Sequence, residues 1–284
     1  MKIYISSLCL KDKKIKDAIL LLKERGFSYI ELTGGSDYYA GLEEDLLDLH
    51  RSSGIDFLMH NYFPPPKEHF VINLASLDND VYYKSIGHLK RALDLCRALD
   101  INKFGLHAGI LMDLEVYQLG IPIVASQFYN RQAALNRFCA GYEKIRKYAG
   151  NINIYVENHI LRSSVLEKLG DEIPLMLTCF QDYLELRKRI DIIPLLDVAH
   201  LKVSSLTLGL DFSKELQSFS SYTDYLHIGD IGEENQEHQP FSKNSLLLKE
   251  LQVLRLKDKT VTLEINGDIS DIQRSFRLIE EVAE

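Results

Sequence analysis

The stretch that decides the fold is Ile192-Ile-Pro-Leu-Leu-Asp-Val-Ala-His200, a short apolar run that ends in an acid and, three residues later, a histidine. A run of this length and composition is typical of a β-strand buried on both faces. Burying Asp197 beside His200 costs on the order of several kcal/mol unless the carboxylate finds a partner, and a metal ion is one such partner. If a metal is that partner, other strands should end in the same way.

Strand-like runs rich in Ile, Val, Leu and Tyr alternate with helical patterns along the whole chain, without a Gly/Ser-rich linker between them. Eight parallel strands, each followed by a helix, form a sheet that closes on itself, whereas an open doubly wound sheet usually has about five to seven strands. We therefore predict a single α/β domain over residues 1–284, a (β/α)8 TIM barrel. The expected strands cover residues 2–6, 29–33, 56–60, 103–107, 153–157, 192–197, 224–227 and 260–264.

The helices expected between these strands carry apolar residues at three- and four-residue spacing, which indicates a face turned toward the core. The connections after the third, fourth, fifth and seventh strands are long, and residues 61–66 and 110–130 are expected to form walls over the barrel mouth. The four clearest apolar stripes are Ile15, Ala18, Ile19 and Leu22; Tyr82, Ile86, Leu89, Leu93 and Cys96; Leu135, Phe138, Tyr142, Ile145 and Tyr148; and Ile272, Phe276, Ile279 and Val282.

Most of the expected strands end in a residue with an acidic or imidazole side chain. Six of the eight are Asp, Glu or His, and in a (β/α)8 barrel these positions surround the active site. A single histidine at a strand end is more often a hydrogen-bonded core residue, but carboxylates that converge on one pocket repel one another unless a cation lies between them. The eight residues are Ser6, Thr33, His60, His107, Glu157, Asp197, His227 and Glu264. The remaining histidines His50, His69, His88 and His159 carry no second signal, and we leave them outside the site.

Three carboxylates and one imidazole in this ring form a candidate metal site. Oxygen-rich ligand sets suit Mn²⁺, Mg²⁺ or Co²⁺, and Zn²⁺ also accepts them. The fifth and eighth strands stand nearly opposite one another, so Glu157 and Glu264 could reach the two faces of a bound sugar. Such an arrangement can remove a proton beside a carbonyl and return it elsewhere. The four expected metal ligands are Glu157, Asp197, His227 and Glu264.

Six short motifs follow one another along the chain at the ends of the expected strands: Phe57-Leu-Met-His60, Leu106-His-Ala-Gly109, Tyr155-Val-Glu-Asn158, Leu196-Asp-Val-Ala-His200, Leu226-His-Ile-Gly-Asp230 and Leu263-Glu-Ile265. Taken together and in this order, they resemble the xylose isomerase-like TIM barrel superfamily of sugar isomerases and epimerases, which also contains DNA-repair enzymes of the endonuclease IV type. The resemblance covers essentially the whole chain.

The resemblance implies a role for each matching residue. Glu157, Asp197, His227 and Glu264 would hold one divalent metal, Glu157 and Glu264 would also be the acid/base pair, and the reaction would pass through a metal-stabilised enediolate. His60 and His107 would line the sugar pocket in the isomerase branch or bind an additional zinc in the endonuclease branch. The substrate-binding residues expected on this basis are His60, His107, His200, Asp230 and His238.

The chain departs from both branches. Ketose 3-epimerases of the superfamily carry an acid where this chain has Ser163, and an arginine in the loop after the seventh strand, where residues 228–254 have none. The endonuclease branch expects Asp-x-His in that loop, where this chain has Gln236-Glu-His238. These departures argue against ketose 3-epimerase activity itself and leave the three-zinc cluster incomplete.

Three functions remain open: a metal-dependent isomerase or epimerase of a small sugar, sugar phosphate or keto-polyol; an endonuclease IV-like zinc phosphodiesterase acting on abasic DNA; and a non-catalytic or metal-free sugar-binding barrel. The formal net charge of −8 repels a phosphate backbone and favours a small-molecule carbohydrate substrate over nucleic acid. No stretch approaches the ~20 apolar residues of a membrane helix, and the first seven residues are too short an apolar run for a signal peptide. We expect a cytoplasmic protein without a membrane partner, which could form a homo-oligomer.

Overall fold

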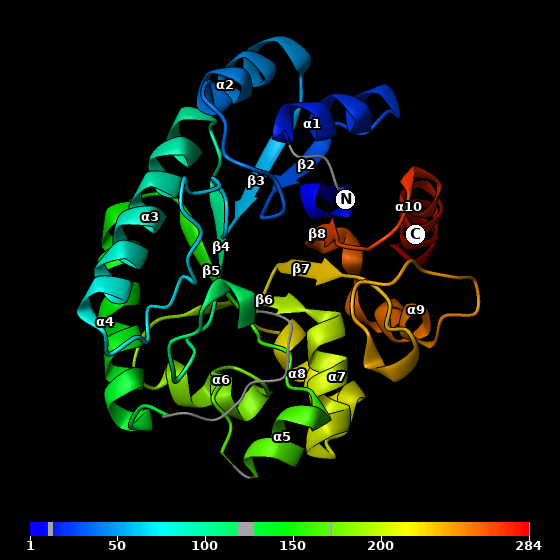
Figure 1. Cartoon of the computed structure of the whole chain (residues 1–284). Helices are drawn as coiled ribbons and strands as arrows, with labels where there is room; N and C mark the ends of the chain where they lie inside the picture. The colour runs from blue at the N-terminus through cyan, green and yellow to red at the C-terminus, as the bar shows by residue number, and fades with distance from the viewer. Residues whose placement is uncertain (11–13, 119–127, 171, 284) are drawn as a thin grey trace.

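A computed structural model describes residues 1–10, 14–118, 128–170 and 172–283 of the protein. Eight parallel strands are hydrogen-bonded in chain order, and β1 pairs with β8 to close the barrel (Figure 1). The predicted (β/α)8 barrel is thereby confirmed. The strands are β1 Lys2–Ser6, β2 Tyr29–Leu32, β3 Asp56–His60, β4 Lys103–His107, β5 Asn153–Glu157, β6 Ile193–Asp197, β7 Tyr225–Ile228 and β8 Thr260–Leu263.

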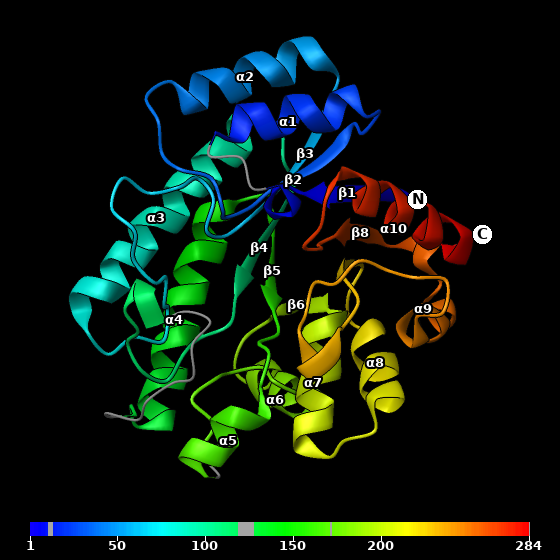
Figure 2. The ribbon, with the colours of Figure 1, turned by 45° about the vertical axis from the view of Figure 1, so that its right-hand side comes forward.

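Helices surround the strands on the outside, and Figures 1 and 2 show α3 and α4 side by side along β4 and β5. No helix among the described residues is long and apolar enough to cross a membrane. The helices are α1 Ile15–Glu24, α2 Leu42–Ser53, α3 Asn79–Ala98, α4 Arg131–Ala149, α5 Ser163–Leu169, α6 Phe180–Arg187, α7 Val198–Leu208, α8 Phe212–Ser220, α9 Leu246–Leu251 and α10 Ile269–Ala283.

The predicted apolar stripes of the helices pack onto the strands, with one exception at the end of α4. Tyr148 is 36% exposed, and its hydroxyl donates to the carboxylate of Asp94 while Arg97 lies over its ring. The last turn of α4 therefore faces the polar side of α3, so the stripe ends at Ile145.

A layer of large side chains fills the inside of the barrel below the strand ends. Side chains two residues apart on a strand point to the same face of the sheet. Four of the five buried members lie two residues before a site residue, so the member and the site residue both point into the barrel. This layer closes the barrel from below and leaves the polar residues at its upper end. The members are Tyr4, Leu58, Tyr155, Leu195 and Tyr225.

The strand boundaries differ from the prediction by one residue at several ends. β2 ends at Leu32 and β8 ends at Leu263, so Thr33 and Glu264 follow their strands, whereas β7 continues to Ile228 and includes His227. The expected wall over residues 110–130 is described only in part, because residues 119–127 lie outside the described residues. Asn61, Tyr62, Ile110 and Leu114 from the two expected walls do line the cavity at the barrel mouth.

Candidate active site

A cavity of about 650 Å³ opens at the carboxyl ends of the strands. Six of the predicted site residues line it, although they come from strands or loops that are far apart in the sequence. In the structure, these residues meet at one pocket. The six residues are His60, His107, Glu157, His200, His238 and Glu264.

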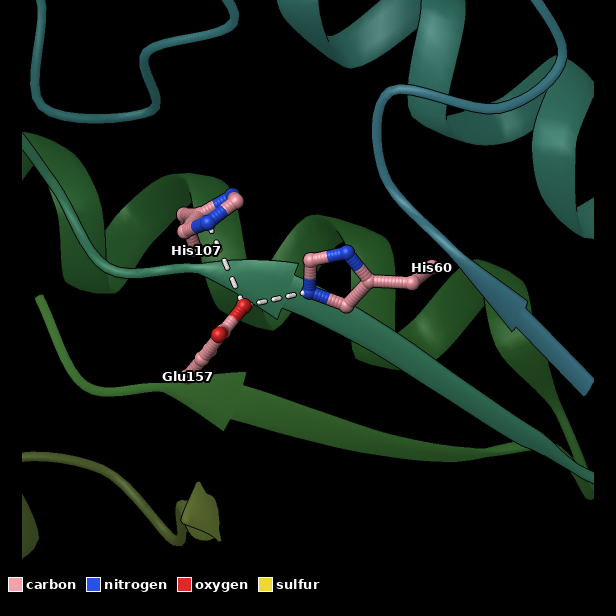
Figure 3. Close-up of side chains that lie close together, drawn as sticks. All are labelled: His60, His107 and Glu157. Carbon is pink, nitrogen blue, oxygen red and sulfur yellow. Dashed lines mark ion pairs between the residues drawn. The ribbon is translucent and has the colours of Figure 1, made fainter. Parts of the chain in front are cut away.

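The carboxylate of Glu157, on β5, is contacted by two histidines, His107 from the adjacent strand β4 and His60 from β3 beyond it (Figure 3). Its Oε2 lies 2.7 Å from Nε2 of His60 and 3.2 Å from Nε2 of His107. The side-chain oxygen of Asn61 lies 3.1 Å from Nδ1 of His107. Because an amide oxygen only accepts, Nδ1 carries the proton, and Nε2 presents its lone pair to Glu157.

A second group adjoins the first and shares Glu157. One oxygen or nitrogen atom from each of Glu157, Asp197 and His227 lies within 4.8 Å of the others. Nδ1 of His227 is 3.6 Å from Oε1 of Glu157 and 3.0 Å from Oε2 of Glu264. Three of the four predicted metal ligands thus form one group, and the fourth, Glu264, lies beside that group in contact with His227.

Asp197 also belongs to a third group, with His200 and His238, and it fixes the position of His200 because it is the N-cap of α7. Its Oδ1 accepts a hydrogen bond of 2.7 Å from the backbone N–H of His200, so strand β6 passes directly into the helix. The side chain of Asn158 accepts a hydrogen bond from the N–H of Asp197 and donates one to the carbonyl of Asp197. The backbone carbonyl of Asn158 accepts a hydrogen bond from Nδ1 of His200. Asp197, His200 and His238 form a further cluster with ligand atoms within 4.8 Å of one another.

The buried polar atoms of these groups fit a bound cation. Six atoms of the site residues have no hydrogen-bond partner among the residues that the structure describes, although several lie at ion-pair distance from a neighbour. Buried polar atoms are nearly always hydrogen-bonded, so an unpaired set on convergent carboxylates and imidazoles matches metal ligands. The atoms are Nε2 of His60, Oε2 of Glu157, Oδ2 of Asp197, both ring nitrogens of His227 and Nδ1 of His238.

The electrostatics of the site keep two carboxylates ionised. Burial opposes the charge of Glu157, but His107 and His60 outweigh burial and hold its pKa well below the usual range. Burial likewise opposes the charge of Glu264, but His227 and His238 lower its pKa to about 2. For Asp197 burial prevails, and its pKa is raised. Glu157 and Glu264 are therefore the two carboxylates that carry a negative charge in the cavity.

The histidines divide into neutral and charged members. Burial lowers the pKa of His107 to about 3, so its imidazole is neutral at physiological pH. Burial would also lower the pKa of His200, but Asp197 and Glu157 outweigh it and raise the pKa. Burial would lower the pKa of His227 as well, but the neighbouring carboxylates raise this pKa well above its usual value, and Glu31 makes the largest raising contribution. Without a metal, the imidazolium of His227 supplies the positive charge that the carboxylates require.

Two cavity residues were not predicted from the sequence. His159 follows β5 and lines the cavity, with its ring stacked on that of His107 at 5.6 Å. Burial lowers the pKa of His159 to about 4. Arg162 lines the cavity from the same loop and forms an ion pair with Glu237 of the loop after β7. Their position shortly after Glu157 is the signal that could have identified them.

Two other acidic residues differ from the sequence expectation in their location. Asp230 lies outside the lining of the cavity as the described residues form it, and its carboxylate accepts from the N–H of Ile231. Its backbone pairs with Gln239, which folds back the loop that carries His238. Glu31, on β2, is fully buried beneath the site and lies 2.9 Å from His227. We expected Thr33 to represent this strand, but Glu31, two residues earlier, also points inward.

Solved structures of several enzymes have the same fold. A D-tagatose 3-epimerase-like protein is 17% identical, covers 99% of this chain and 97% of its own, and has a TM-score of 0.74. D-psicose 3-epimerase from Clostridium cellulolyticum is 15% identical, with coverage of 100% and 96% and a TM-score of 0.65. Endonuclease IV from Thermus thermophilus is 15% identical, with coverage of 99% and 100% and a TM-score of 0.63. At such identities the likeness establishes the fold alone.

A comparison with curated protein sequences finds no match. A family model described as "Xylose isomerase-like TIM barrel" matches residues 19–281, which is most of the chain. The match agrees with the closed barrel of eight parallel strands and with the ring of acids and histidines at its mouth. The protein therefore belongs to the family of xylose isomerase-like TIM barrels.

Proposed function

We propose that the protein is a metal-dependent isomerase or epimerase of a small sugar, sugar phosphate or keto-polyol. The observation that carries the proposal is the placement of Glu157 and Glu264, two ionised carboxylates that both line the cavity and both contact Nδ1 of His227. They stand at the carboxyl ends of β5 and β8, which are separated by two strands around the ring. One carboxylate removes a proton beside the substrate carbonyl, and the other takes up a proton from water and delivers it to the substrate. The first then releases its proton to solvent.

A divalent metal, Mn²⁺, Mg²⁺, Co²⁺ or Zn²⁺, would be held by Glu157, Asp197, His227 and Glu264. When bound, it polarises the substrate carbonyl and stabilises the negative charge that develops as the proton leaves. Asn158 supports this role by fixing the backbone of Asp197, and the capping bond to His200 fixes the Asp197 carboxylate itself.

Neutral imidazoles in the cavity suit a polyhydroxylated substrate. His107 donates its Nδ1–H to Asn61 and His159 donates its Nε2–H to the carbonyl of Ala108. Each ring is kept neutral by a pKa lowered to about 3 and about 4, so each retains one lone pair that can accept a hydrogen bond from a sugar hydroxyl. The volume of about 650 Å³ is of the size that encloses a small molecule. His60, His200 and His238 are proposed to contact substrate oxygens in the same cavity, and Asp230 to act through the loop that carries His238. The net charge of −8 favours such a substrate over nucleic acid. A cytoplasmic location and a homo-oligomer remain predictions.

The test is turnover by the Mn²⁺-loaded protein of D-fructose, D-tagatose, D-fructose 6-phosphate and a 3-ketoglucoside. Glu157→Gln and Glu264→Gln should each reduce turnover by at least about 100-fold, because each removes a general acid/base group. Glu281→Gln, the same change at an exposed position of α10, is the matched control and should retain full activity. Wild-type turnover in Glu264→Gln would refute the proposal.

A second function is supported by the additional ligand groups around the central one. The His60–His107–Glu157 group shares Glu157 with it, and the Asp197–His200–His238 group shares Asp197. Three adjacent metal sites are the arrangement expected of a zinc phosphodiesterase, although Gln236 stands where that branch has an acid. Incubation of the zinc-loaded protein with duplex DNA that contains one abasic site tests this function. Strand cleavage that His107→Ala abolishes would favour it, and intact DNA would eliminate it.

A further inference from the structure

Glu31 is a fully buried carboxylate below the cavity that the proposed proton transfer does not use. It lies on β2, in register with Ser6 of β1 and Leu58 of β3, and its side chain points across the inside of the barrel. A buried carboxylate costs on the order of several kcal/mol unless its oxygens are paired. Its partners therefore indicate why the position is charged.

Three side chains from β7 and β8 meet the Glu31 carboxylate inside the barrel. The hydroxyl of Tyr225 donates to Oε2, and the hydroxyl of Thr262 donates to the same oxygen over 2.7 Å. The other oxygen, Oε1, lies 2.9 Å from Nε2 of His227. Thr262 is the register partner of His227 on the adjacent strand, so the two hydroxyls hold Oε2 while Oε1 faces the imidazole.

The two nitrogens of His227 therefore face different groups. Nε2 faces Glu31, whereas Nδ1 faces Glu264 at 3.0 Å and Glu157 at 3.6 Å. Two other candidate ligand histidines also have one nitrogen engaged by a fixed oxygen: His107 by the side chain of Asn61 and His200 by the backbone carbonyl of Asn158. For His227 the fixed oxygen belongs to a carboxylate, which binds an N–H more strongly than an amide or a carbonyl does.

We propose that Glu31 is a positioning residue for the metal site, which holds the proton of His227 on Nε2 and thereby leaves Nδ1 as the metal ligand. This inference rests on the proposed metal site of the preceding section. Carboxylates that bond the outer nitrogen of a ligand histidine fix its tautomer and orientation and increase its basicity, and their loss typically weakens metal binding about 10- to 100-fold. Oε1 of Glu31 and Nε2 of His227 lie at ion-pair distance without completing a hydrogen bond.

The experiment is a Co²⁺ titration of the purified full-length protein, followed by the visible absorption spectrum, together with melting of the metal-free protein. Glu31→Gln keeps the size of the side chain and removes its charge. Glu31→Asp keeps the charge and withdraws it from Nε2. Thr262→Val is the matched control, because it removes one hydroxyl from Oε2 and leaves the carboxylate in place.

Glu31→Gln should weaken Co²⁺ binding about 10- to 100-fold and alter the shape of the spectrum, Glu31→Asp should weaken it less, and Thr262→Val should change it less than about threefold. Wild-type affinity and spectrum in Glu31→Gln, with only a lower melting temperature of the metal-free protein, would assign Glu31 a structural role and overturn the proposal. If Glu31→Gln does not fold, wild-type affinity in Glu31→Asp has the same meaning. Failure of the wild-type protein to bind Co²⁺ would instead contradict the metal site itself.

Discussion

The imidazole of His60 occupies the space that a side chain at residue 105 would need. A β-carbon on Gly105 would lie 2.4 Å from Cδ2 of His60 and 2.8 Å from Cδ1 of Leu195. Both distances are far shorter than a van der Waals contact. A glycine on β4 thus allows His60 of the adjacent strand to turn inward and reach Glu157.

Gly105→Ala should displace His60 from Glu157 and destabilise the protein by about 1–3 kcal/mol, because the packed interior has no room for the methyl group. Urea unfolding measures the change in stability. Gly87→Ala is the control, since this glycine lies in α3 with no atom within 4 Å of the added carbon. It should stabilise the protein by about 0.5–1 kcal/mol. Equal effects of the two substitutions would contradict the assigned role of Gly105.

The fold could be predicted because strand and helix periods alternate eight times without interruption. Each predicted strand overlaps an observed one, and errors at the ends are of one residue, as at Thr33 and Glu264. Such errors arise because a strand end depends on hydrogen bonds to neighbouring strands, which a local pattern does not reveal. The loops were predicted only as long and functional, without their conformation.

Convergence of the site could be predicted from the barrel geometry, which brings all strand ends to one face. The contacts among the residues could not. Glu31 was missed because only the last residue of each strand was considered, although its inward position two residues earlier follows from strand alternation. His159 and Arg162 were missed because their placement depends on loop conformation, which brings one onto His107 and the other onto Glu237.

A pH-dependent loss of stability is expected from His88, on the buried face of α3 beside Phe70. Burial, with a smaller contribution from Arg91, lowers its pKa to about 4. Between pH 6.5 and about 4 the unfolded chain binds this proton and the folded protein does not, so stability falls as pH is lowered through that window. His88→Leu should remove roughly 1–3 kcal/mol of this loss. Urea unfolding of the wild-type protein and of His88→Leu at about pH 7 and about pH 4.5 checks this, because most of the window lies between these two values. Equal losses of unfolding free energy in the two proteins would refute the assignment.

Divalent metal should stabilise the protein through Asp197. At a Mn²⁺ concentration of about 100 times Kd, binding contributes about 2.7 kcal/mol, which corresponds to a rise in Tm of roughly 5 °C or more. Asp197→Asn separates metal binding from helix capping. Asparagine also caps helices well and can keep the bond to the N–H of His200, while the negative charge that binds the metal is lost. Its Tm should rise much less with Mn²⁺. Differential scanning calorimetry of both proteins measures this, and equal rises would argue against Asp197 as a ligand.

Solvent deuterium incorporation tests the central claim, proton transfer by two carboxylates, most directly. The Mn²⁺-loaded protein is incubated with the keto sugars named above in D₂O, and the product is examined by proton NMR. If one of Glu157 and Glu264 removes the proton and the other delivers a proton taken up from water, the delivered hydrogen comes from the solvent. The account predicts about one deuterium per turnover at the reacting carbon, and a loss of at least about 100-fold in Glu264→Gln. Product that forms at the wild-type rate in Glu264→Gln, or without deuterium at that carbon, would contradict it.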